Sequence, residues 1–188
     1  MKEGDGNKYV LWLFLAILFT FELYSISIQS SYIWDGIFLI GFLLFVYYLK
    51  DRLRLHPFHF FLLGIFLVLH NIGVFGLYFN SYYGIEFDTY VHFYFGLVST
   101  LMLFRTYDSI VPIKDNRIKY FALLVMILGM SAFHELLEYA GGVMLGEGWG
   151  FLKAGAGDIE MWDTQTDMRN NVFGGLLAIA LYHIKTKF

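Results

Sequence analysis

Six apolar stretches, each close to the length that crosses the hydrocarbon core of a bilayer, constrain this chain most strongly. They cover about residues 9–28, 31–49, 58–79, 89–107, 119–141 and 164–185. A membrane-spanning helix needs roughly 20 predominantly apolar residues, and hydrocarbon leaves only internal partners for the peptide groups. Hydrophobic residues also make up 58% of the 188 positions. We therefore predict an all-α, polytopic integral membrane protein, a single helical bundle over residues 1–188 with about six transmembrane helices.

Lysine and arginine are distributed asymmetrically between the loops. All 13 except Lys153 and Arg169 lie near the termini or in the 50–57 and 105–119 segments. Because basic loops stay on the cytoplasmic side, we expect a plasma (inner) membrane protein with both termini cytoplasmic. A signal peptide at the first stretch is an alternative, although that stretch is long and aromatic for one. The scattered basic residues argue against nucleic acid as a partner, and the absence of cysteine excludes thiolate chemistry.

The polar residues of these stretches gather toward the predicted outer side of the membrane. They are Glu22, Asp35, His70, Asn71, Asp88, His92, His134, Glu135, Glu138, Asp163, Asp167 and Asn171. An ionisable group within a span is costly, so it normally points into the bundle and marks a site. We predict one polar chamber at or just beneath the outer surface. The first four of these residues fit interhelical hydrogen bonds best and are assigned no role.

Three ionisable residues, His134, Glu135 and Glu138, interrupt the apolar stretch 119–141. On a helix they spread over about 100° of one face. The set is similar to the inward-facing glutamates and histidines of di-metal bundles. It is not the His-Glu-x-x-His zinc signature, because Glu138 stands where the second histidine would be. The negative charges of two glutamates in one span need a positive charge to balance them, which a cation would supply.

Two further patterns extend this candidate site. Asp88 and His92 are one helical turn apart, as two ligands of one metal or a carboxylate orienting an imidazole would be. Asp163, Asp167 and Asn171 form a ridge of the same spacing at the start of the last stretch. Helix capping by Asp88 or Asp163 is the alternative in each case, but it does not account for the deeper residues of the ridge.

The longest connection, the glycine-rich loop 142–163, also carries tryptophan and phenylalanine. A loop of this length in a small protein is often functional, and aromatic side chains suit the headgroup level of a membrane. We consider two interpretations, a re-entrant or interfacial lid over the polar chamber and a plain surface loop.

Taken together, the motifs resemble a known family. They are Glu86-Phe87-Asp88-x-x-x-His92-Phe93-x-x-Gly96, Glu135-x-x-Glu138 and Trp162-Asp163-Thr164-Gln165-x-Asp167-x-x-x-Asn171. This order is similar to that of the YjdF family of inner-membrane proteins and, more distantly, of VanZ-like proteins, over about residues 85–178. His134 departs from the family pattern. The resemblance implies a residue set rather than a particular reaction, since VanZ-like proteins are linked to glycopeptide resistance without an agreed chemistry.

These observations predict a divalent-metal site at the outer face. Its candidate ligands are Asp88, His92, His134, Glu135, Glu138, Asp163, Asp167 and Asn171. Carboxylates with a few imidazoles suit Zn, Mn, Fe or Mg. The expected chemistry is a metal-activated water that hydrolyses a lipid-linked phosphate or ester, with Glu135 or Glu138 as general base. Two alternatives remain open, a non-enzymatic ion, proton or small-ligand binding or transport protein and an accessory membrane subunit.

Overall fold

A computed structural model describes residues 3–111, 113–145 and 163–185. Its helices are α1 (Glu3–Ser27), α2 (Ile33–Leu49), α3 (Pro57–Val74), α4 (Phe87–Ile110), α5 (Asn116–Leu145) and α6 (Asp163–Lys185). The short 3₁₀ helix η1 (Leu77–Phe79) and an antiparallel hairpin of β1 (Ser81–Tyr82) and β2 (Ile85–Glu86) join α3 to α4. The predicted all-α class is therefore confirmed.

Three of these helices are long and apolar enough to cross a membrane by length and composition. They are the stretches 6–27, 57–74 and 116–145, and α2 is a shorter apolar helix. A bundle with several such helices fits the bilayer, because hydrogen bonding within each helix satisfies its backbone. That the other helices also span the membrane stays a prediction.

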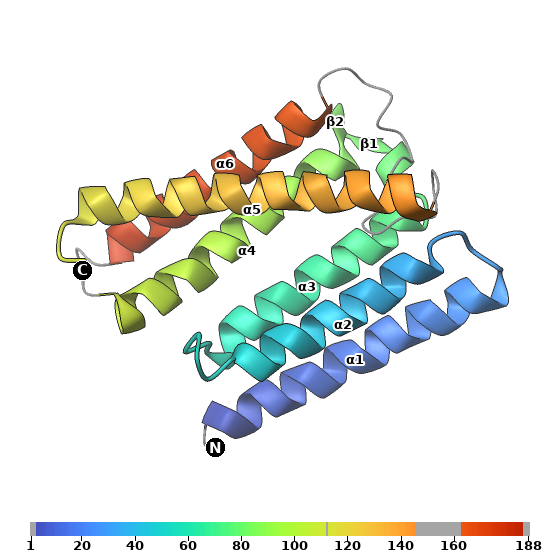
Figure 1. Ribbon diagram of the computed structural model, residues 1–188, viewed down its shortest axis with the longest axis horizontal. Coiled ribbons are helices and arrows are strands. Elements are labelled where there is room, and N and C mark those ends of the chain that lie inside the picture. The colour runs from blue at the N-terminus through green and yellow to red at the C-terminus, as the bar shows by residue number, and fades with distance from the viewer. Residues whose placement is uncertain (1–2, 112, 146–162, 186–188) are drawn as a thin grey trace.

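The helices form two groups, α1–α3 and α4–α6, which lie beside each other where α3 meets α4 (Figure 1). Within the first group, Leu18, Leu43 and Phe60 are almost completely buried, and within the second Leu123 and Ile127 are. The contact between α4 and α6 is the most extensive of all helix pairs. Many other large apolar side chains, especially on α5, are exposed, as expected of helices that face lipid.

The basic loops lie together at one end of the bundle. The Arg105 Nε donates to the backbone oxygen of Arg54 at 2.9 Å, which ties α4 to the α2–α3 turn. The start of α1 and the end of α6 lie at this same end (Figure 1). The arrangement is the one that two cytoplasmic termini require, although which side of the membrane this end faces stays a prediction.

At the predicted outer side, two helix ends differ from the sequence prediction by more than two residues. Helix α3 ends at Val74, before the expected residue 79, because the chain turns at Gly76, whose φ of 121° suits glycine. Helix α5 continues to Leu145, so the first residues of the predicted outer loop are helical. The remainder of that loop, residues 146–162, lies outside the described residues, and the lid prediction concerns that part.

Two glycines allow the close approach of α4 and α6. A Cβ at Gly96 would lie 1.9 Å from the backbone oxygen of Asn171, and one at Gly174 would lie 1.9 Å from that of Phe93. Any larger residue would push the two backbones apart. This contact places the first turns of α4 beside the first turns of α6, where the candidate site residues lie.

Candidate metal centre

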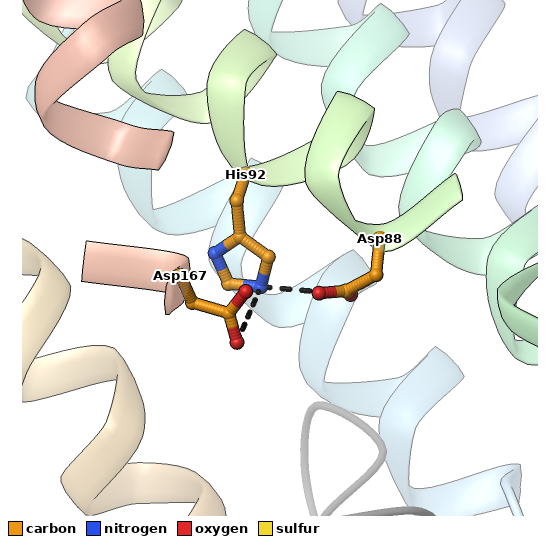
Figure 2. A group of neighbouring side chains, drawn as sticks. All are labelled: Asp88, His92 and Asp167. Atoms are coloured by element: carbon orange, nitrogen blue, oxygen red, sulfur yellow. Dashed lines mark ion pairs between the residues drawn. The ribbon is translucent and has the colours of Figure 1, made fainter. Parts of the chain in front are cut away.

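Three of the predicted ligands converge on one point between α4 and α6. The His92 Nε2 lies 3.6 Å from Oδ1 of Asp88 and 3.5 Å from Oδ2 of Asp167. Figure 2 shows the two carboxylates approaching this nitrogen from opposite sides. One ligand atom from each residue fits within a span of 4.8 Å, and among the described residues no other histidine, aspartate and glutamate set of this kind is found.

The spacing of these atoms matches that of ligands around a single ion. Two ligands bound at roughly 2.1 Å in a tetrahedral arrangement lie roughly 3.4 Å apart. The distances of 3.5 and 3.6 Å are close to this value and are longer than an ordinary N–H···O hydrogen bond. The side chains of His92 and Asp167 are 10% and 5% exposed, so two ionised carboxylates would repel each other in this poorly solvated site unless they share a proton, as the side-chain hydrogen bond between Asp167 and Asp88 allows, or bind a cation. A cation would relieve that repulsion.

Asn171, one turn beyond Asp167 on α6, holds the other side of the His92 ring. Its Nδ2 lies 3.4 Å from Nδ1 of His92 and donates to Oγ of Ser131 at 2.6 Å. With the amide turned by 180°, its oxygen would accept from His92 Nδ1–H and from the Ser131 hydroxyl, leaving the lone pair of Nε2 for a metal. Such an outer partner commonly fixes the tautomer and orientation of a metal-binding histidine.

The α5 residues form a separate layer beside this group. His134 Nε2 lies 3.3 Å from Oε1 of Glu138, and the His134 ring stands edge-on to the His92 ring at 5.6 Å. Glu135 interacts electrostatically with both His134 and Asp167. The three residues are half-buried, whereas Phe133 is exposed on another face of α5. They therefore line the site without belonging to the close ligand group.

Asp163 lies in the first turn of α6 and interacts electrostatically with Asp167. Asp163 is also outside the close ligand group, at the N-terminal end of the polar ridge on α6. The sequence analysis included Gly96 in the family motif without assigning it a packing role, and it did not single out Ser131, which contacts Asn171. Ser131 could have been found because it precedes His134 and Glu138 at helical spacing on the same face.

The fold and the site define a class, a small helical membrane protein with a buried carboxylate–histidine cluster near one end of its bundle. The family model described as "Predicted membrane protein (DUF2238)" matches residues 8–187, almost the whole chain. The chain therefore belongs to this family of membrane proteins. No curated protein and no solved structure matches it.

Proposed function

We propose that Asp88, His92 and Asp167 bind one divalent cation, with Asn171 orienting the imidazole. The observation that supports this most directly is the convergence of two carboxylate oxygens on Nε2 of His92 at distances typical of co-ligands. Carboxylate oxygens with one imidazole suit Zn, Mn, Fe or Mg. His134, Glu135, Glu138 and Asp163 then surround the ion without being required as ligands.

We further propose that the ion serves hydrolysis of a lipid-linked phosphate or ester. A bound divalent cation lowers the pKa of water and polarises a phosphoryl or carbonyl oxygen. The water oxygen bonds to phosphorus or carbon, the bond to the leaving alcohol breaks, and a glutamate passes the water proton to that alcohol. Glu138, paired with His134, and Glu135, near Asp167, are the proton acceptors that the site offers. The position of the site within a membrane bundle supports a lipid-linked substrate over a soluble one.

Purified protein in lipid nanodiscs tests this activity. We expect release of phosphate from a prenyl phosphate, or of fatty acid from a phospholipid, that stops with a chelator and returns with metal. Glu138→Gln or Glu135→Gln should lower kcat by about 100- to 10,000-fold while metal content is unchanged, because one proton acceptor is lost. Asp51→Asn, which changes an exposed carboxylate in the α2–α3 turn, is the matched control. Bound metal without turnover would instead support the non-enzymatic binding interpretation.

Asn171, which contacts the ring nitrogen of His92 that faces away from the proposed metal, and its partner Ser131 give a further prediction. Replacing Asn171 with alanine should weaken metal binding by about 10- to 100-fold, since the imidazole loses the contact that orients it. Ser131→Ala should act in the same direction through Asn171, and Ser99→Ala, which removes a buried hydroxyl elsewhere on α4, should have no such effect. Competition with a fluorescent chelator measures each affinity. Equal affinity in Asn171→Ala and the wild type would contradict this role.

The resemblance to YjdF and VanZ-like proteins stays part of the proposal. It rests on the spacing of Asp88, His92, Glu135, Glu138 and Asp167, of which three form the close ligand group. The description of the matched family model gives a membrane protein and no reaction.

A further inference from the structure

A second set of buried polar residues lies in the α1–α3 half of the bundle. It consists of Glu22 on α1, Asp35 on α2, His70 and Asn71 on α3, and Tyr78 on η1. Their exposed fractions are between 0 and 9%. Buried ionisable groups in a membrane bundle need partners, so the partners of each one decide what this set does.

His70 and Asp35 form one end of the set and have partners. The His70 Nε2 lies 3.3 Å from the Asp35 carboxylate, and its Nδ1 lies 2.8 Å from the Tyr78 hydroxyl. Both ring nitrogens are therefore engaged. His70 is the one residue of this set that can carry a positive charge, and it pairs with Asp35, so Glu22 has no positive partner within the set.

Glu22 on α1 and Asn71 on α3 have side-chain oxygens that lack hydrogen-bond donors. Both carboxylate oxygens of Glu22 and the amide oxygen of Asn71 are buried, and no hydrogen-bond donor reaches them among the described residues. Phe21 and Tyr24 both contact Phe75, one turn beyond Asn71, so α1 and α3 adjoin at this level. These oxygens are acceptors that only a donor or a cation can satisfy.

Gly36 makes room for the Glu22 carboxylate beside Asp35. A Cβ at Gly36 would lie 1.9 Å from Oε2 of Glu22, so the carboxylate occupies the space that a side chain would take. Glu22 also interacts electrostatically with Asp35. The Glu22 side chain is thus directed toward α2, into the polar set rather than toward lipid.

We propose that Glu22 anchors a second cation site in the α1–α3 half, which takes a hard monovalent cation such as Na⁺. A proton on Glu22 would turn one oxygen into a donor and could satisfy one acceptor, whereas a cation can coordinate several oxygens at once. The atoms available to bind a cation are oxygens, because both ring nitrogens of His70 already contact Asp35 and Tyr78. This site differs in chemistry from the centre at His92, and the inference does not rest on hydrolysis.

Thermal unfolding of the full-length protein in detergent tests the proposal. At equal ionic strength and pH, we expect the Tm to be about 5 °C or more higher in saturating Na⁺ than in choline chloride, because a ligand that binds the folded state stabilises it. In Glu22→Gln the difference should disappear. Glu86→Gln, an exposed glutamate, should keep it. The His92→Ala variant should also keep it, which separates this site from the metal centre.

Gly36→Ala provides a second variant that leaves the charges unchanged. Its methyl group should displace the carboxylate of Glu22, a flexible side-chain end, and reduce the Na⁺ response even if Glu22→Gln folds poorly. The proposal would be overturned by a Tm that is the same in Na⁺ and choline, or by a response that follows pH alone, which would indicate a proton. A response to Ca²⁺ with none to Na⁺ would overturn the monovalent assignment.

Discussion

Replacing His92 with alanine is expected to remove tightly bound divalent metal, with a loss of affinity of more than about 100-fold, the upper end of what outer-partner mutations cost. His92 supplies the nitrogen on which Asp88 and Asp167 converge, at 3.6 and 3.5 Å. Without it, two carboxylates on adjacent helices remain, and they offer a cation weaker, less directed binding. Chelator competition followed by elemental analysis of the purified protein measures the change.

His59→Ala is the matched control for this experiment. His59 lies near the start of α3, at the basic end of the bundle, away from the ligand group. Its replacement should leave metal affinity unchanged, so a loss confined to His92→Ala would show that the site, and not histidine content, sets the affinity. Wild-type affinity in His92→Ala would assign any bound metal to other residues, with His134 and Glu138 the next to test.

Gly96→Ala is expected to lower the free energy of unfolding by about 3 kcal/mol, the upper part of the range for overpacked sites. The added Cβ would lie 1.9 Å from the backbone oxygen of Asn171 and 2.6 Å from its carbonyl carbon, and neither atom can move without shifting α6. Because the same contact aligns Asp167 with His92, metal affinity should fall in parallel. Unfolding in a denaturing detergent mixture, followed by helix signal, measures the stability.

Gly129→Ala on α5 is the control for that substitution. A Cβ at Gly129 would have no atom within 4 Å, so only the intrinsic helix propensity changes. Alanine is favoured over glycine by about 1 kcal/mol in a helix interior, which predicts equal or slightly greater stability. If Gly96→Ala were as stable as Gly129→Ala, the close packing of α4 against α6 would be wrong.

The fold followed from the sequence because hydrophobic length alone limits what can cross a bilayer. The six apolar stretches correspond to the six described helices, and only helix ends were misplaced. The end of α3 depends on a positive φ at Gly76, which hydropathy does not report. The pairing of helices was not predictable either. It depends on backbone approaches such as that of Gly96 to Asn171, which join residues far apart in the chain.

The candidate site was predicted as a set of residues and not as a geometry. Helical spacing placed Asp88 with His92 and Glu138 with His134, and both pairs form. The sequence could not show that Asp167, rather than the α5 acids, would reach His92, since this depends on which helix packs against α4. Glu22, Asp35, His70 and Asn71 were set apart from the candidate ligands, but the sequence did not show that they gather in the α1–α3 half, because they lie at the same depth as the ligands.

Anomalous diffraction from crystals loaded with Mn²⁺ or Zn²⁺ locates the ion and so tests whether Asp88, His92 and Asp167 bind it. We expect one strong peak between α4 and α6, about 2.0 to 2.2 Å from Nε2 of His92 and from carboxylate oxygens of Asp88 and Asp167. A peak elsewhere, or crystals that take up no metal while these three side chains keep their positions, would contradict it.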